Sequence, residues 1–172
     1  MNRPDPTEYG AAYQTYVSLV PESDILATLS TELSSSVAFL QAIPESEAGR
    51  LHPPYTWTAR QVVGHLIDSE RIFAYRALRI GRNDPTPLPG FDENPYVEAG
   101  EFDRFPLADL VSEFETVRLG SLRLFEHFPP DACGRTGLAS NATVSVQALA
   151  YIIVGHQRHH LTILRRRLSH AR

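Results

Sequence analysis

The sequence is poor in the residues on which several protein classes depend. Cys133 is its single cysteine, so an internal disulfide framework and a cysteine-rich zinc module are both excluded. There is no lysine among its 16 basic residues, which excludes a Schiff base on lysine and a P-loop lysine. The longest strongly apolar run, residues 148–154, is far shorter than the roughly 20 residues that span a bilayer. We therefore expect no membrane partner.

The charge of the chain argues against a nucleic-acid partner. The formal net charge is −4, whereas nucleic-acid-binding domains usually carry a basic patch or stripe. Met1 is followed by Asn-Arg-Pro-Asp, so the apolar segment of a secretory signal is not seen. A cytoplasmic protein is the expectation.

The apolar pattern predicts an all-α four-helix bundle. Four segments place apolar residues three and four positions apart, and a cap, a proline or a glycine bounds them. These segments span residues 24–43, 58–81, 106–128 and 145–169. No segment alternates apolar and polar residues for long enough to predict a strand. Residues 23–172 would form the bundle domain, and residues 1–22 an N-terminal arm packed on it.

The second segment has the clearest boundaries. Thr58 and Gln61 form a capping box, and Gly81 is expected to end the helix in the left-handed conformation. The connection that follows, residues 81–105, is too long for a turn between bundle helices. Because long ordered loops often cover a site, this one would be a lid or a crossover between the second and third helices.

Two histidines interrupt the apolar face of the fourth segment. With 100° per residue, His156 and His160 lie about 40° apart on the helix, on the side of Leu149 and Ile152. Buried polar groups need partners, so these rings either bond to neighbouring helices or hold a metal ion together. The residue after His156 is Gln157, which excludes the H-E-x-x-H metalloprotease motif.

A third candidate ligand, His65, lies at the edge of the apolar face of the second helix. Three histidines without a fourth protein ligand would leave coordination positions open, which is typical of a catalytic metal site. Zinc, nickel, iron and manganese all accept such ligands. The other histidines rank lower. His159 is expected at the helix edge; the alternative is that it supports the His156–His160 pair without binding the metal. Solvated rings are expected at His52, His127 and His170.

Few other side chains are candidates for chemistry. Asp68 is the weak catalytic candidate, because it lies one turn from His65 and could orient that ring or accept a proton; the alternative is a surface acid. Glu70 is expected to form an ion pair with a neighbouring helix. Arg76 is expected to form a stabilising salt bridge; the alternative is that it binds an anionic group of the substrate. Cys133 has no evident activating histidine and is interpreted as passive.

Three stretches resemble the DinB/YfiT-like family. Residues 57–70 (WTARQVVGHLIDSE) resemble its second helix, residues 154–161 (VGHQRHHL) its metal-binding fourth helix, and residues 86–91 (TPLPGF) its intervening loop. The resemblance covers most of residues 23–170. It implies a four-helix bundle, often a homodimer, with one divalent metal ion bound by His65, His156 and His160. All three ligand positions match the family pattern.

The resemblance implies two enzymatic functions and leaves a third possibility open. In the first, the metal activates water and the protein is a hydrolase of an unknown small molecule. In the second, the metal binds a low-molecular-weight thiol as thiolate, and the protein is an S-transferase or isomerase. The third is a non-catalytic binding bundle connected with stress. Zinc or nickel is the expected ion, ahead of iron or manganese.

Overall fold

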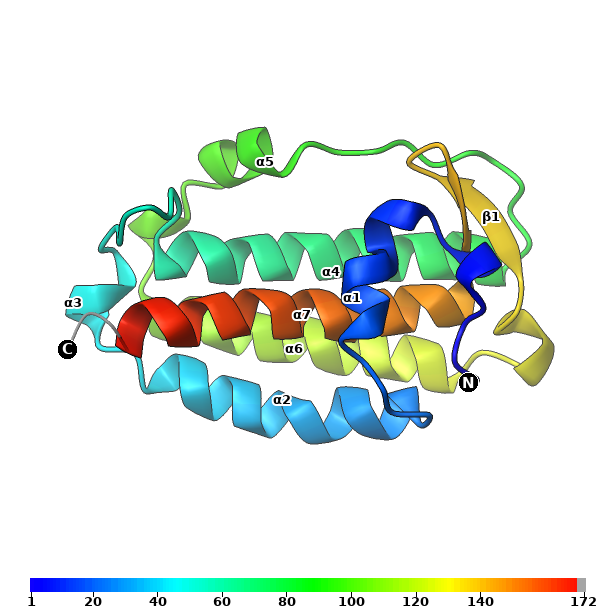
Figure 1. Ribbon diagram of the computed structural model, residues 1–172, viewed down its shortest axis with the longest axis horizontal. Helices are drawn as coiled ribbons and strands as arrows, with labels where there is room; N and C mark the ends of the chain where they lie inside the picture. The colour runs from blue at the N-terminus through cyan, green and yellow to red at the C-terminus, as the bar shows by residue number, and fades with distance from the viewer. Residues whose placement is uncertain (170–172) are drawn as a thin grey trace.

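Four long helices form the body of the protein. The computed structural model describes residues 1–169, so His170 lies outside the described residues. The long helices are α2 (Ile25–Gln41), α4 (Ala59–Gly81), α6 (Leu107–Glu126) and α7 (Val146–Ser169) (Figure 1). They confirm the predicted four-helix bundle and all four predicted segments.

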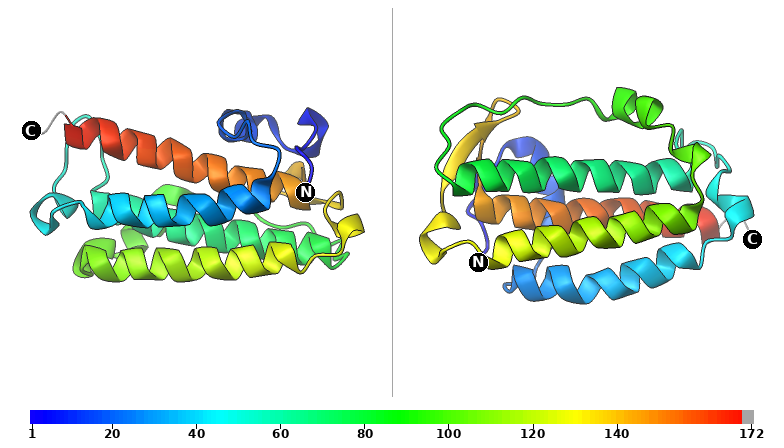
Figure 2. Two further views of the ribbon diagram at one scale, coloured as in Figure 1. Left: turned by 90° about the horizontal axis from the view of Figure 1, so that it is seen from below. Right: turned by 180° about the vertical axis from the view of Figure 1, so that it is seen from behind.

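The arrangement of these helices explains the long connection. Both α2 and α4 pack against α6 and α7, so α2 lies diagonally opposite α4. Helices α4 and α6 run in the same direction (Figures 1 and 2). Because the end of α4 and the start of α6 lie at opposite ends of the bundle, the chain must return along its whole length. On the way it forms α5 (Glu93–Gly100) and the 3-10 turn η3 (Phe102–Arg104).

The capping residues act largely as predicted. Thr58 and Gln61 form both hydrogen bonds of the capping box at the start of α4, and Asp24 caps α2. Gly81 ends α4, but the prediction of its left-handed conformation is wrong. The residue with positive φ is Asn83, at 60°, whereas Gly81 is small because the Phe128 ring packs against it.

A short hairpin that the sequence pattern did not predict precedes α7. Strand β1 (Thr136–Ala139) pairs antiparallel with β2 (Ala142–Ser145). The two turn residues, Ser140 and Asn141, have φ of 52° and 62°, as a two-residue type I′ turn requires. Four residues per strand are too few for alternation to stand out from the surrounding loop. The long connection joins the hairpin, because Leu88 exchanges backbone hydrogen bonds with Leu138 and Ser140.

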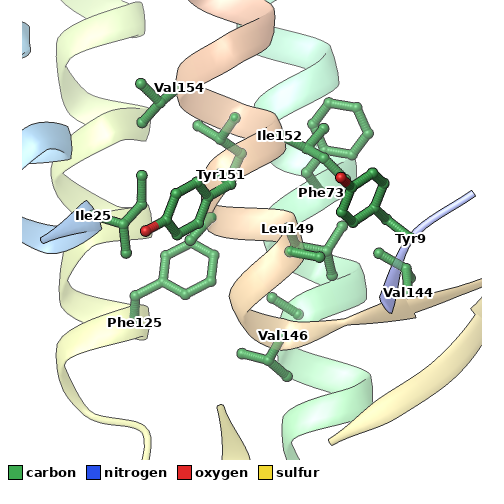
Figure 3. Close-up of a cluster of buried hydrophobic side chains, with 14 of the residues drawn as sticks. Tyr9, Ile25, Phe73, Phe125, Val144, Val146, Leu149, Tyr151, Ile152 and Val154 are labelled. Carbon is green, nitrogen blue, oxygen red and sulfur yellow. The ribbon is translucent and has the colours of Figure 1, made fainter. Parts of the chain in front are cut away.

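The first 22 residues pack along α7. They contain the short turns η1 (Pro6–Glu8) and η2 (Ala11–Tyr13) and the five-residue helix α1 (Gln14–Ser18), which crosses α7 in Figure 1. Gly155 permits this contact, since a Cβ at that position would overlap the Tyr16 carbonyl group. The arm also completes the core, where Tyr9 lies beside Phe73 and Leu149 (Figure 3).

Short elements close the ends of the bundle. Helix α3 (Glu45–Ala48) joins α2 to α4, and the turn η4 (Pro130–Ala132) follows α6.

Among residues 1–169, no helix is both long and apolar enough to cross a membrane.

Candidate metal centre

His65, His156 and His160 meet between α4 and α7. The Nε2 atoms of His65 and His156 are 2.9 Å apart, and one ligand nitrogen from each ring lies within 4.8 Å of the others. The ring centroids are 4.8, 4.8 and 4.5 Å apart. Adjacent helices therefore bring together the three rings that the sequence identified, although 91 residues separate His65 from His156.

Burial keeps these rings neutral. It lowers the pKa of His65 from 6.5 to about 4, with partial compensation from the negative charge of Glu93. It lowers the pKa of His160 to about 3 and that of His156 well below 6.5, and the neighbouring histidines add to both shifts. A neutral imidazole has a free nitrogen lone pair, which is the form that binds a metal ion.

The donor set fits a divalent transition metal. Nitrogen ligands bind zinc at about 2.0–2.1 Å, so the ligands of one ion lie near each other, as these three nitrogens do. The alternative, hydrogen bonds from these rings to neighbouring helices, is met in part, because His156 on α7 lies within hydrogen-bond distance of His65 on α4. Within residues 1–169, the ring nitrogens of these histidines make two polar contacts: the His65–His156 pair and a long one, 3.4 Å, from His65 Nδ1 to Ser69 Oγ.

Aromatic rings enclose the three histidines. The Trp57 ring lies 4.9 Å from that of His65 and is nearly parallel to that of His160 at 6.4 Å. On the other side, Tyr16 presents its ring edge-on to His156 at 5.1 Å. These rings limit the access of water, and burial raises the pKa of the Tyr16 hydroxyl.

The histidines line a cavity of about 360 Å³ that is large enough for a small molecule. The cavity wall also contains residues that the sequence did not single out as site residues, drawn from the arm, the long connection and the hairpin. These are Tyr13, Tyr16, Phe91, Glu93 and Ser140. The long connection therefore serves both as a crossover and as part of the wall of the site. Glu93, the first residue of α5, is the carboxylate that lines this cavity.

Asp68 does not line the cavity. Its carboxylate is 3.7 Å from Arg71, and burial raises its pKa. Ser69, rather than Asp68, contacts the second nitrogen of His65. His159 lines the cavity beside Tyr16 but is not one of the three clustered histidines. Cys133 lies in a different hollow, near Gly134 and Gln147.

The predictions for the remaining charged candidates are confirmed in part. Glu70 forms the expected ion pair, with Arg118 on α6. The prediction of a salt bridge for Arg76 is wrong, because among the described residues its guanidinium donates only to neutral oxygens. The prediction of a solvated His52 is also wrong, since its ring is largely covered and lies 3.0 Å from Glu47, whereas His127 is exposed as predicted.

Solved structures with the same fold include two enzymes or probable enzymes. One is YfiT from Bacillus subtilis, described as a probable metal-dependent hydrolase with an unusual four-helix bundle topology. It is 17% identical, with a TM-score of 0.68 over 96% of this chain and 93% of that chain. The other is a mycothiol-dependent maleylpyruvate isomerase, 14% identical, with a TM-score of 0.67 over 86% of this chain. This chain spans only 62% of the isomerase.

Sequence comparison assigns the family. No curated protein sequence matches the chain. The family model of the DinB superfamily matches residues 28–164, which include all three clustered histidines. The chain belongs to the DinB superfamily.

Proposed function

We propose that the protein is a metal-dependent hydrolase of a small molecule, with His65, His156 and His160 as the metal ligands. The observation that carries this proposal is the convergence of three neutral imidazoles on a cavity that also contains the Glu93 carboxylate. A divalent cation held by three histidines would keep open positions, would act as a Lewis acid and would lower the pKa of a water molecule. The similarity to YfiT, a probable metal-dependent hydrolase, supports the same reaction class.

Glu93 is the side chain that would accept a proton in this reaction. It lines the cavity, and its negative charge acts on both His65 and Tyr16. A carboxylate near the reacting water is a suitable general base. Asp68 would not contact the substrate, because its carboxylate lies outside the cavity.

A second candidate is a thiol-dependent transferase or isomerase. The similarity in fold to the mycothiol-dependent isomerase favours it. In this reaction the cation would stabilise the thiolate of a small thiol, and Cys133, which lies outside the cavity, would take no part. A requirement for added thiol distinguishes this candidate from the hydrolase.

The first experiment measures the metal content of protein purified without a histidine tag or a nickel column. Plasma mass spectrometry should find about one divalent ion per chain, since one three-histidine group is present among the described residues. Zinc or nickel is the expected ion. His65→Ala, His156→Ala and His160→Ala should each abolish stoichiometric binding. His159→Ala is the matched control, because that ring lines the cavity outside the ligand group. A variant of a proposed ligand that binds metal as tightly as wild type would remove that residue from the site.

The second experiment assays the metal-loaded protein against a panel of small esters, amides and lactones, with and without added thiol. Hydrolysis without thiol supports the hydrolase and contradicts the thiol-dependent candidate. Replacement of Glu93 by Gln should lower kcat at least tenfold, since general-base catalysis contributes about 10²–10⁴-fold, with metal content unchanged. Stoichiometric metal and no reaction with any substrate class would favour the binding bundle.

A further inference from the structure

Arg76 is a buried cation without a carboxylate partner among residues 1–169. The residue is 2% exposed. The guanidinium donates to the Pro89 carbonyl at 2.8 Å, to Ser140 Oγ at 2.9 Å and to Tyr13 Oη at 3.3 Å. Arg118, a fully buried arginine of α6, is instead neutralised by both oxygens of Glu70. Because an isolated buried charge is costly, the unneutralised guanidinium calls for an explanation.

The two hydroxyls bonded to Arg76 still have protons to donate. A hydroxyl that accepts a hydrogen bond from a guanidinium keeps its own O–H free. Within residues 1–169, neither the Tyr13 nor the Ser140 hydroxyl donates to a protein acceptor. Both residues line the cavity that contains the three histidines. The cavity thus has two hydroxyl donors polarised by one cation.

These donors lie where the cavity wall meets Arg76. One phenyl ring separates the cation from the histidines, since Phe73 lies 5.9 Å from Arg76 Cζ and 5.9 Å from the His156 ring. The Glu93 carboxylate acts electrostatically on His65 and Tyr16, which belong to the histidine end. An anion beside Tyr13 and Ser140 would therefore lie next to the positive charge of Arg76, which contacts both hydroxyls.

We infer that the Tyr13 and Ser140 hydroxyls, held by Arg76, bind the carboxylate of an organic acid. Two donors fixed by one guanidinium match the two oxygens of a carboxylate, and the uncompensated charge favours the anion over a neutral amide. This inference deepens the proposed function: the substrate would be a small organic acid whose reacting group lies a few bonds from its carboxylate, at the histidine end. The acid itself can bind without any metal.

A purely structural role for Arg76 makes a different prediction. The guanidinium ties together the arm through Tyr13, the long connection through Pro89 and the hairpin through Ser140. If that were its only role, loss of Arg76 would lower stability but no ligand would distinguish an anion from its neutral analogue.

The test compares butyrate with butyramide, which have nearly the same shape and differ in charge. Both are titrated by NMR into metal-free and zinc-loaded ¹⁵N-labelled protein. We expect butyrate to bind at least tenfold more tightly in both forms, because hydrogen bonds to a charged group are stronger. The largest amide shifts should be at Tyr13, Ser140 and Asn141.

Three variants locate the preference. The double variant Tyr13→Phe with Ser140→Ala removes both donors and leaves Arg76 in place, so it decides the question even if Arg76→Gln fails to fold. The double variant and Arg76→Gln should each abolish the preference for butyrate. Arg71→Gln is the matched control, since it removes the same charge from an exposed position of α4 and should keep the preference.

Equal binding of butyrate and butyramide to the wild type would overturn the inference, as would an unchanged preference in the double variant. A preference seen only with zinc would also overturn it, because the carboxylate would then bind the metal. None of these results bears on metal stoichiometry. Failure of the proposed function would appear instead as absent metal or absent turnover.

Discussion

Glu70 on α4 neutralises Arg118 on α6 inside the bundle. Its two oxygens accept from the guanidinium at 2.8 and 2.9 Å, and the side chains are 4% and 1% exposed. Removing one partner of a buried ion pair costs about 3–5 kcal/mol, because the other charge stays buried. We therefore expect Glu70→Gln to lower the free energy of unfolding by about that amount in urea denaturation. Glu113→Gln, which breaks the exposed pair with Arg71, should cost less than about 1 kcal/mol. Equal losses of stability in the two variants would contradict the interpretation of Glu70 and Arg118 as a buried ion pair.

The buried histidines make the metal-free protein sensitive to acid. The pKa of His65 is about 4 and that of His160 about 3 in the folded protein, against 6.5 in an unfolded chain. Between these values the unfolded chain binds protons that the folded chain does not. The free energy of unfolding should thus be greatest above pH 6.5 and fall progressively as the pH decreases toward about 3.

Chemical denaturation of the metal-free protein across this pH range measures the effect. His65→Gln should reduce the slope of stability against pH, because one buried imidazole no longer titrates. His127→Gln should leave it unchanged, since that ring is exposed. A slope that is the same in wild type and His65→Gln would show that the folded protein protonates His65 without cost.

At the scale of the elements, Gly155 sets how closely α1 approaches α7. A Cβ there would overlap the backbone of Tyr16, which cannot rotate away as a side chain could. Overpacking of this kind costs about 1–3 kcal/mol, so Gly155→Ala should destabilise the protein despite the higher helix propensity of alanine. A methyl group added at Gly120, on the exposed side of α6, would meet no atom within 4 Å, and Gly120→Ala should stabilise by about 0.5–1 kcal/mol. Thermal unfolding of both variants measures the difference, and a stabilised Gly155→Ala would show that the arm does not press on α7.

The sequence predicts those parts of the site that are local. The Thr58 capping box and the His156–His160 spacing depend on neighbours within one helix, so their placement follows from helical geometry alone. His65 could be placed on a face of α4, but not opposite a particular partner. Helical geometry could not show which of Glu70 and Arg76 has a charged partner. Only the packing shows that Glu70 meets Arg118, whereas Arg76 meets neutral oxygens.

The residues that the sequence missed come from irregular segments. Tyr13, Glu93 and Ser140 enter the cavity from the arm, the long connection and the hairpin turn. None of these segments has a periodic pattern from which a direction could be read. The Ser140–Asn141 turn is the signal that was available, since asparagine tolerates positive φ and such pairs often join two strands.

For the whole molecule, metal binding and folding are expected to be linked. The three proposed ligands come from two helices and meet only in the folded bundle, so an ion that they hold would bind the folded state and not the unfolded chain. Zinc at 100 times its dissociation constant would add about 2.7 kcal/mol, which for a chain of this size raises Tm by roughly 5–10 °C. Calorimetry with and without zinc measures the shift. It should disappear in His156→Ala and persist in His159→Ala; a shift that survives in His156→Ala would place the ion elsewhere.

The diagonal pairing of the helices also governs how the chain would behave if it were split. A break in the connection between α4 and α6 would give one fragment with α2, α4 and His65, and another with α6, α7, His156 and His160. Each long helix packs on the two helices of the other fragment, so neither fragment has a bundle of its own to bury its apolar faces. The apolar faces of the two fragments are therefore complementary. Because the three histidines are divided between the fragments, binding of a metal ion by all three would indicate that the fragments had reassociated.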